Sequence, residues 1–227
     1  MEPTAKKAAK RKRARIPTTE ELLAHERELW AAGVERVAGI DEVGVGPLAG
    51  PVVAAAVVMP KTGAIEGVRD SKKLSRKQRE RLDEAIRSVA VGIGVGIVSP
   101  AEVDRLNPYQ AGLRAMQNAV CALPEPPGHL LVDARRVPDV ETPQTSIIRG
   151  DGSVYAIAAA SIVAKVHRDR LMEQIDEEYP GYGFAQHVGY ATAKHLEALR
   201  RLGPCPQHRR SYAPVKAALA RHEGGPH

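Results

Sequence analysis

Two adjacent carboxylates, Asp41 and Glu42, follow an apolar run and precede a turn that is rich in glycine and proline. A second apolar run, 52–58, comes after the turn and consists of valine and alanine. Such a run predicts a strand buried on both faces, and the glycines and prolines exclude a helix between the two runs. We read the first run as a strand that stops at the two acids, where desolvation is costly without a compensating cation or hydrogen-bond donor. A surface hairpin that happens to carry two acids would give the same local pattern.

Two further carboxylates stand in similar settings and favour a cation site. Asp133 ends a short apolar run, 129–133, and Asp151 lies just before a long helix predicted over 154–178. Taken alone, Asp133 could be a turn former and Asp151 a helix cap on a favourable dipole. Strand ends within one sheet can converge, however, and a helix packed on that sheet can direct its N-terminus at them. We therefore expect these side chains to join the first pair in one small volume.

The expected chemistry follows from that convergence. Four carboxylates in a small volume repel one another and raise one another's pKa values. Two hard divalent cations would remove the repulsion, and they could clamp the attacking water and the leaving oxygen of a phosphodiester. The glycines of the turn leave room for a ligand to approach the main chain. Lys72, in a loop before a helix N-terminus, suits a polyanionic substrate, although a solvated cationic turn would explain that loop equally well.

The composition predicts one sizeable domain. The chain has 227 residues, of which 43% are hydrophobic and only 4% aromatic, so Val, Ile, Leu and Ala must fill the core. No apolar run is long enough for a membrane span, and no apolar signal region follows the basic N-terminus. Cys121 and Cys205 make neither a disulfide framework nor a zinc site, and the eight histidines show no ligand spacing. We expect a reduced, cytoplasmic setting without a membrane.

The basic character of the chain belongs to its N-terminal segment. Residues 1–16 hold seven basic side chains and one acidic side chain, which accounts for the whole formal net charge of +6. This segment has no apolar periodicity, and we expect it to be disordered. It could follow a nucleic-acid backbone electrostatically, or it could be a solubilising extension. A nuclear-localisation signal is a weaker alternative for its Lys-Arg run.

Capping signals and hydrophobic spacing place the secondary structure. Ser75 with Gln78 and Ser99 with Glu102 are capping boxes that predict two helix starts. Glycine at every second position of a strand predicted over 89–98 would let a helix pack closely on one face. The other predicted elements are a helix of about 15 residues between Pro17 and Gly33, helices over 108–123 and 193–202, an extended segment over 145–149 and a short C-terminal helix.

Six motifs in this order resemble bacterial ribonuclease HII, of the type 2 ribonuclease H family. They are Gly39-Ile-Asp41-Glu42-Val-Gly44-x-Gly46-Pro-Leu-Ala-Gly-Pro-Val, Asp70-Ser-Lys-Lys-Leu-Ser, Leu-Val-Asp133, Gly150-Asp151, Ala158-Ala-Ala-Ser-Ile-Val-Ala-Lys165-Val-x-Arg168-Asp169-Arg and Gly189-Tyr190-Ala-Thr. The resemblance implies an α/β ribonuclease H-like fold, a mixed central β-sheet flanked by helices, with a C-terminal helical segment. The expected division is a disordered basic tail, 1–16, an N-terminal helix, 17–36, a catalytic domain, 37–215, and a short C-terminal tail, 216–227.

The resemblance also implies an activity. It is metal-dependent endonucleolytic cleavage of the RNA strand of RNA–DNA hybrids, and cleavage 5′ of ribonucleotides embedded in duplex DNA, as in ribonucleotide excision repair. The products would carry 5′-phosphate and 3′-hydroxyl ends, and Mn²⁺ or Mg²⁺ would be required. The implied partners are RNA–DNA hybrid and ribonucleotide-containing duplex DNA, bound by a monomer.

The resemblance assigns the four acids to the catalytic centre. Asp41, Glu42 and Asp133 match the family's metal-binding carboxylates, and Asp151 matches its fourth catalytic acid. All four are therefore expected to be catalytic and to bind metal.

The resemblance also assigns the substrate contacts. Gly44, Val45 and Gly46 match the turn whose backbone reads the ribose 2′-hydroxyl, the group that separates RNA from DNA. Tyr190 matches the tyrosine that packs on the adjoining sugar, and Lys72 matches a phosphate contact. The family usually has Gly-Arg-Gly in the turn, so Val45 removes a cation near the substrate phosphates. We expect this difference to change the affinity for substrate and the selectivity for the RNA–DNA junction.

Two other classes of protein remain as alternatives. One is a nuclease of the same superfamily that acts on DNA alone, which the hydroxyl-reading turn and Tyr190 disfavour. The other is a nucleic-acid-binding protein without catalysis, which the four intact carboxylates disfavour.

Overall fold

A computed structural model of the chain describes residue 15 and residues 17–223. Apart from Arg15, the segment predicted to be a disordered basic tail lies outside the described residues. Within residues 15 and 17–223, no helix is both long enough and apolar enough to cross a membrane.

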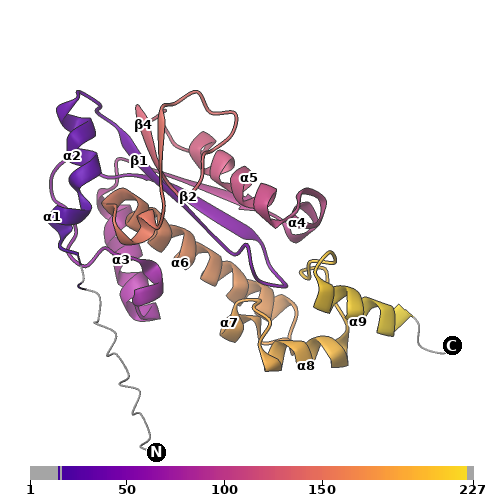
Figure 1. Cartoon of the computed structure of the whole chain (residues 1–227). Helices are drawn as coiled ribbons and strands as arrows, with labels where there is room; N and C mark the ends of the chain where they lie inside the picture. The colour runs from indigo at the N-terminus through magenta and orange to yellow at the C-terminus, as the bar shows by residue number, and fades with distance from the viewer. Residues whose placement is uncertain (1–14, 16, 224–227) are drawn as a thin grey trace, which may run out of the picture.

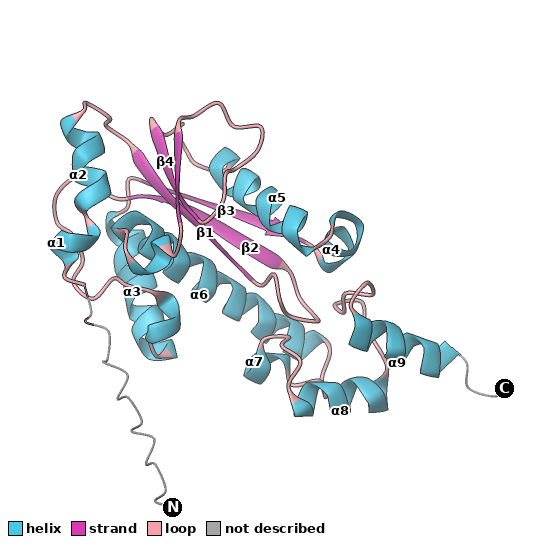
Figure 2. Cartoon of the chain, viewed as in Figure 1, coloured by secondary structure: helices cyan, strands magenta, loops and turns pink. Residues whose placement is uncertain are grey.

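Five strands form one mixed sheet in the order β3-β2-β1-β4-β5. The strands are drawn in magenta in Figure 2. The strands are β1 (Val37–Val43), β2 (Val52–Val58), β3 (Gly92–Val98), β4 (His129–Asp133) and β5 (Gln144–Ile147). Strands β1, β2 and β3 pair antiparallel, whereas β1, β4 and β5 pair parallel. Every residue of β2 is buried, as its unbroken apolar run predicts. The mixed central sheet expected from the sequence is therefore confirmed.

Helices cover both faces of this sheet (Figure 1). Helix α6 (Tyr155–Glu178) crosses β1 and β2 on one face, and α5 (Pro108–Cys121) covers β2 and β3 on the other. The core divides accordingly, because Ala55 and Val57 of β2 pack on the α6 side and Ala54 and Ala56 on the α5 side. The other helical segments are α1 (Thr19–Leu22), α2 (Ala24–Ala31), η1 (Ser71–Lys73), α3 (Arg76–Val89), α4 (Pro100–Leu106), η2 (Gly150–Gly152), α7 (Phe184–His187), α8 (Ala193–Leu202) and α9 (Ala213–Glu223).

Small residues set how closely the helices approach the sheet. A Cβ on Gly39 of β1 would lie 2.0 Å from the backbone of Ala156 in α6. On the other face, a Cβ on Gly94 of β3 would lie 2.0 Å from the carbonyl oxygen of Ala119 in α5. Neither contact is possible for a residue with a side chain. The glycine-rich strand therefore acts as predicted, by bringing the backbone of α5 onto the sheet, and the alanine-rich start of α6 approaches β1 equally closely.

The predicted helix starts are confirmed. Ser75 and Ser99 each accept a hydrogen bond from the third residue of the following helix, and both capping boxes with Gln78 and Glu102 are complete. Thr192 caps α8 in the same way.

Several boundaries differ from the prediction. Strand β1 does not stop at Asp41 and Glu42 but continues to Val43, because these residues keep their antiparallel pairing with β2. The glycine-rich strand begins at Gly92, since α3 extends through Val89. The N-terminal helix is interrupted at Leu23, which separates α1 from α2.

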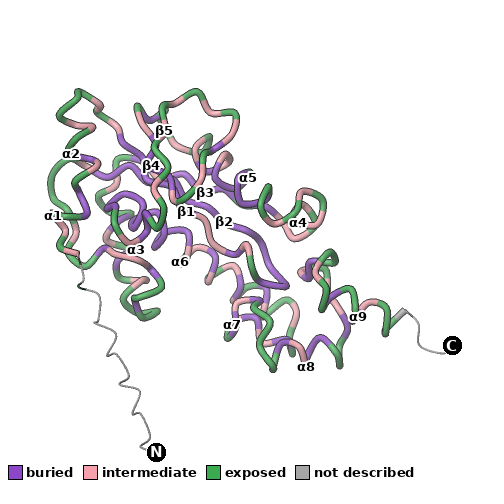
Figure 3. The backbone as a smooth tube through the Cα atoms, in the orientation of Figure 1, coloured by how far each residue is buried: buried purple, intermediate pink, exposed green. Residues whose placement is uncertain are grey.

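The C-terminal helices α7, α8 and α9 gather at the end of α6 that lies away from α1 and α2 (Figure 1). They carry small cores of their own, one of which joins Leu48, after the carboxylate-bearing strand, to Leu199 of α8 and Val215 of α9. The division expected at residue 215 lies within α9. Buried residues, purple in Figure 3, occur both in the sheet and in the C-terminal helices.

Candidate active site

The four predicted acids lie at one end of β1 and β4. The parallel pairing of β1 with β4 ends at Ile40, opposite Val132, while the antiparallel pairing with β2 continues through Asp41 and Glu42. The two acids are therefore held in a strand but have no strand partner on one side. Asp133 is the last residue of β4.

The two adjacent acids have different neighbours. Asp41 is only 6% exposed, and the Ser161 hydroxyl of α6 favours its ionised form. The side chain of Glu42 instead approaches α5, and its carboxylate lies 3.4 Å from Nη1 of Arg135. This division follows from the strand, because successive side chains point to opposite faces of a sheet.

The other two acids are joined through the start of α6. The backbone N–H of Gly150 donates to Oδ1 of Asp133 at 2.7 Å. Asp151 is buried in η2, one turn before α6, and Nζ of Lys72 donates to its Oδ2 at 2.8 Å. The predicted phosphate contact, Lys72, is thus placed against the carboxylates, and this pairing raises its pKa.

Burial and mutual repulsion disturb the ionisation of this cluster. Burial raises the pKa of Asp41 well above its usual range, and the charges of Glu42, Asp133 and Asp151 add to that rise. Burial raises the pKa of Glu42 to about 7 against the opposing charge of Arg135. The pKa of Asp133 is also raised, mainly by burial, although the Gly150 hydrogen bond opposes the shift. The folded chain therefore holds acids that are costly to keep ionised without a further positive charge.

The donor chemistry of the cluster fits divalent cations. Carboxylate oxygens are hard ligands, suited to Mg²⁺ and Mn²⁺. In the described part of the chain, no three His, Cys, Asp or Glu side chains already form a group that could hold a metal ion. The acids instead take Lys72, Arg135 and the Gly150 N–H as partners. These neighbours compensate the negative charge only in part, as the raised pKa values of Asp41 and Glu42 indicate.

The predicted ribose-reading turn follows directly after β1. Gly44 adopts a φ of +92°, and a Cβ there would lie 2.3 Å from Nε of Arg168 and 2.8 Å from the carbonyl oxygen of Pro51. Gly46 is exposed, and a Cβ there would meet only Cε1 of Tyr190, at 3.8 Å. The two glycines are thus needed for different reasons. The backbone conformation requires Gly44, whereas Gly46 leaves the surface beside Tyr190 open.

The turn and Tyr190 are neighbours in space although 144 positions separate Gly46 from Tyr190 in the numbering. Tyr190 is 47% exposed, and Leu48 donates its backbone N–H to the carbonyl of Gly189 at 2.9 Å. Val45 is half-buried and packs toward α5, where it and Arg135 both flank Gly112. Arg135 therefore places a cation beside position 45.

Two buried arginines beneath the turn were not assigned from the sequence. Arg209 donates to the carbonyls of Gly44, Val45 and Gly50, and Arg168 donates to the carbonyls of the Ala49–Pro51 stretch. Both side chains are fully buried. Arg168 lies within one of the motifs quoted above, but Arg209 lay in a segment distinguished only by its basic charge.

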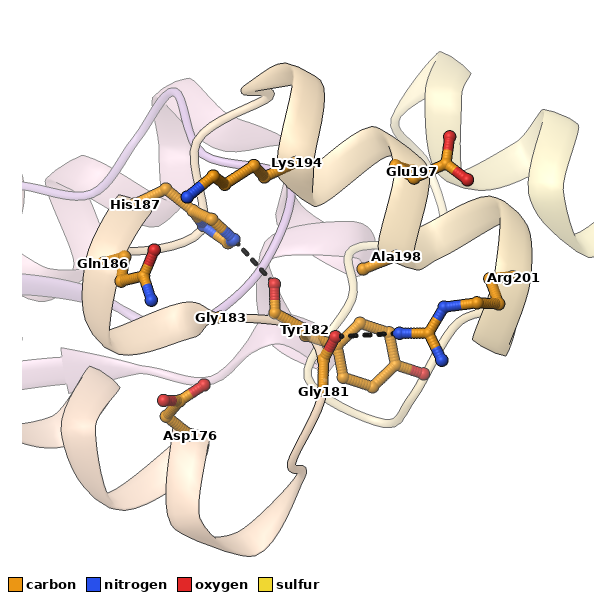
Figure 4. Close-up of a pocket in the computed structure, with 10 residues that line it drawn as sticks. All are labelled: Asp176, Gly181, Tyr182, Gly183, Gln186, His187, Lys194, Glu197, Ala198 and Arg201. Carbon is orange, nitrogen blue, oxygen red and sulfur yellow. Dashed lines mark hydrogen bonds between the residues drawn. The ribbon is translucent and has the colours of Figure 1, made fainter.

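A separate hollow of about 490 Å³ lies between α7 and α8. It contains none of the four acids, and His187 at its wall shares a hydrogen bond with the carbonyl of Tyr182 (Figure 4). Its lining residues are Asp176, Gly181, Tyr182, Gly183, Gln186, His187, Lys194, Glu197, Ala198 and Arg201.

Comparison with known proteins gives consistent matches. The family model described as ribonuclease HII matches residues 38–215. Ribonuclease HII of Geobacillus kaustophilus is 57% identical over 200 residues, which cover 88% of this chain and 76% of the relative. Ribonuclease HII of Geobacillus thermodenitrificans is 55% identical over 213 residues, which cover 94% of this chain and 82% of the relative.

Solved structures agree on the fold. Ribonuclease H2 of Pyrococcus horikoshii superposes with a TM-score of 0.72 at 26% identity, covering 84% of this chain and all of that one. The structure of Bst ribonuclease HIII in complex with Mn²⁺ superposes with a TM-score of 0.64 at 22% identity, covering 84% of this chain and 71% of that one. The mixed sheet with flanking helices is therefore a ribonuclease H-like fold.

Proposed function

The chain belongs to the ribonuclease HII family, the ribonuclease H endonucleases that act on RNA–DNA hybrids and depend on divalent metal, and on that premise we propose which bonds it cleaves and with which residues. The proposed substrates are RNA–DNA hybrids and DNA duplexes with embedded ribonucleotides, cut on the 5′ side of the ribonucleotide. The proposed products carry 5′-phosphate and 3′-hydroxyl ends. The observation that carries this proposal is the adjacency of an acidic cluster and a backbone-lined turn on one surface.

Asp41, Glu42, Asp133 and Asp151 are the proposed ligands of the metal, either Mn²⁺ or Mg²⁺. The raised pKa values of Asp41, Glu42 and Asp133 support the assignment, because a bound cation would relieve the cost of ionising these carboxylates. When bound, such cations supply Lewis-acid activation of water and stabilisation of the leaving oxygen. The Mn²⁺ in the Bst ribonuclease HIII structure is consistent with this choice of ion.

The remaining residues bind and orient the substrate. The backbone at Gly44, Val45 and Gly46 is proposed to contact the ribose 2′-hydroxyl, and Tyr190 to pack on the adjoining sugar. Support for this comes from the 3.8 Å spacing between Tyr190 and the position of a Cβ on Gly46. Lys72 is proposed to exchange its bond to Asp151 for a substrate phosphate when a metal neutralises that acid.

One assay tests the proposed specificity. Three end-labelled duplexes are offered with Mg²⁺, with Mn²⁺ or with EDTA: one with a single embedded ribonucleotide, one RNA–DNA hybrid and one all-DNA. We expect cleavage of the first two only, dependent on metal, and extension of the 3′ product end by a DNA polymerase. Equal cleavage of the all-DNA duplex would favour the DNA-directed alternative, and binding without cleavage would favour the non-catalytic one.

A further inference from the structure

We propose that residues 205–212 form a positioning element for ribose recognition, in which Arg209 holds the 44–50 turn and His208 holds the backbone at Tyr190, so that turn and tyrosine act as one unit. We call residues 205–212 the strut. The inference rests on the proposed function, since it concerns how the proposed ribose-reading groups are kept in place. It assigns positioning roles to Arg209 and His208.

Arg209 shapes the turn from beneath. Its Nη1 donates to the carbonyl of Val45 at 2.9 Å, its Nη2 donates to the carbonyls of Gly44 and Gly50, and its Nε donates to Gly50 at 3.1 Å. Tyr212 donates its hydroxyl to the same Val45 carbonyl at 2.6 Å. A peptide group whose carbonyl is held in this way cannot rotate freely, so the N–H on its other side keeps its direction.

The guanidinium is suited to this task by its chemistry. It presents five donors in a rigid plane, so one side chain can hold several carbonyls whose directions differ, which an ammonium cannot do as well. Arg209 and Arg168 are fully buried, and among the described residues all their hydrogen bonds go to carbonyl or hydroxyl oxygens rather than to carboxylates. A buried cation is costly without a specific compensation. Here that compensation is the set of carbonyls of the turn.

His208 connects the strut to Tyr190 through a second histidine. The backbone N–H of Cys205 donates to Nδ1 of His208 at 3.0 Å, so Nε2 of His208 must carry the proton. That Nε2 lies 3.1 Å from Nε2 of His195, whose Nδ1 in turn lies 2.8 Å from the carbonyl of Tyr190. With both rings neutral, each donates one hydrogen bond along the line from Cys205 to Tyr190. Burial lowers the pKa of His208 to about 4, which keeps its ring neutral at neutral pH.

Backbone hydrogen bonds join the strut to the turn. The N–H of Arg209 donates to the carbonyl of Leu48, and the N–H of Gly50 donates to the carbonyl of Gln207, each at 2.8 Å. Ala49 and His208 form an isolated antiparallel bridge between these bonds. Leu48 also bonds Gly189, next to Tyr190. Hydrogen bonds therefore connect the turn to the strut, the strut to the backbone of Tyr190, and the turn to Gly189 beside Tyr190. These three connections would hold the proposed unit rigid.

The first test compares Arg209→Met with Arg210→Met. Arg210 is the adjacent, exposed arginine, so the control loses the same charge from the same segment without touching the turn. Dissociation constants are measured, with Ca²⁺ in place of the catalytic metal, for a duplex with one embedded ribonucleotide and for the matched all-DNA duplex. We expect Arg209→Met to reduce the preference for the ribonucleotide duplex at least fivefold, with little change in the all-DNA value. Arg210→Met should leave the preference unchanged.

The outcomes distinguish a failure of the proposed function from a failure of the strut proposal. A wild type without any preference for the ribonucleotide duplex overturns the proposed function. A wild type that has the preference, together with an Arg209→Met variant that keeps it, overturns only the strut proposal. If Arg209→Met does not fold, as judged by its melting curve, Tyr212→Phe replaces it, because it removes a single hydroxyl donor from the Val45 carbonyl. Tyr212→Phe should lower the preference about twofold to threefold, and an unchanged preference in that folded variant equally overturns the proposal.

A double-mutant cycle tests whether His208 acts through Tyr190. His208→Gln and Tyr190→Ala are made singly and combined, and kcat and KM are measured on the single-ribonucleotide duplex. If His208 acts through Tyr190, its replacement should raise KM threefold or more in the wild-type background and barely change it when Tyr190 is already alanine. Equal effects in both backgrounds would show that the histidine line does not position Tyr190.

Discussion

The acidic cluster and the turn beside it both contain buried charged side chains that are not fully neutralised by side chains of opposite charge. The cluster holds Asp41, a residue of β1, with three acidic neighbours that raise its pKa further. The turn covers Arg168 and Arg209, which donate to backbone carbonyls instead of carboxylates. The acidic cluster thus lacks positive charge, whereas the turn has two permanent cations, Arg168 and Arg209.

Under the proposed function, the difference follows from what the acidic cluster and the turn would each bind. An acidic cluster that is to accept exchangeable cations cannot be neutralised by fixed side chains, so it must tolerate repulsion between metal-free carboxylates. A turn that is to present its backbone in one geometry needs permanent donors, and arginine supplies several from one side chain. We expect changes in the acidic cluster to act on catalysis, and changes in the turn to act on recognition.

The largest expected effect is on catalysis. Asp41→Asn keeps the shape of the side chain but removes a negative ligand, so activity should fall by roughly a thousandfold, in the range seen when a group that stabilises transition-state charge is lost. The apparent melting temperature in EDTA should rise, because a desolvated carboxylate that its neighbours repel is removed. Both are measured on one preparation, by cleavage of the single-ribonucleotide duplex and by thermal unfolding.

Asp139→Asn provides the matched control for Asp41→Asn. Asp139 is exposed and has a positive φ of 52°, which asparagine tolerates. It should change neither activity nor stability. Comparable turnover of Asp41→Asn and wild type at saturating Mn²⁺ would refute the assignment of Asp41 as a metal ligand.

The second prediction concerns stability and pH. The pKa of Glu42 is raised to about 7, so the folded state keeps a proton that the unfolded state has lost above about pH 4.5. The free energy of unfolding in EDTA should therefore fall by about 3 kcal/mol on this account as pH rises from 4.5 through 7. Urea unfolding at pH 5 and pH 8 measures it, and Glu42→Gln should flatten the difference.

Added Mg²⁺ should restore much of that lost stability at pH 8 and little of it at pH 5, since metal binds the ionised carboxylates. A metal-dependent gain that is equal at the two pH values would contradict the charge deficit proposed for the acidic cluster.

The third prediction separates the two glycines of the turn. Gly44→Ala should destabilise the fold by about 1–3 kcal/mol, because it places a side chain at a positive φ and against Arg168. Gly46→Ala should leave stability nearly unchanged, since a Cβ there meets only Tyr190 at an ordinary distance. It should instead lower kcat/KM on ribonucleotide substrates by blocking close approach. Urea titrations and kcat/KM for both variants make the comparison, and a destabilised Gly46→Ala would count against it.

The smallest expected effect is at Val45. A cation there would add a charge-assisted contact to a substrate phosphate, which contributes roughly 1.5–3 kcal/mol when fully formed. Because Arg135 already lies beside this position, Val45→Arg should raise kcat/KM by about tenfold at most. The gain should be larger in an Arg135→Met background, and discrimination against all-DNA duplex should hardly change. An equal or smaller gain in that background would show that Arg135 does not substitute for the missing cation.

Much of the fold follows from short-range patterns. The capping boxes at Ser75 and Ser99 need only residues within one helical turn, and the buried run 52–58 needs only its own composition, so both could be predicted. The positions of Asp133 at the end of β4 and of Asp151 before α6 were predictable for the same reason. The extension of β1 past Asp41 could not be predicted, because it depends on pairing with β2. The apolar pattern of β1 does not show which strand pairs with it.

The sequence by itself determined which groups this protein can use: four acids in or beside apolar elements, two glycines in a turn and a tyrosine before α8. Only the tertiary structure decided how they are held. Arg209 reaches carbonyls about 160 positions away, and His208 contacts His195, whose ring in turn contacts the carbonyl of Tyr190. Side-chain contacts of that range leave no periodicity or spacing in the sequence, since their geometry exists only after the sheet and the C-terminal helices have packed.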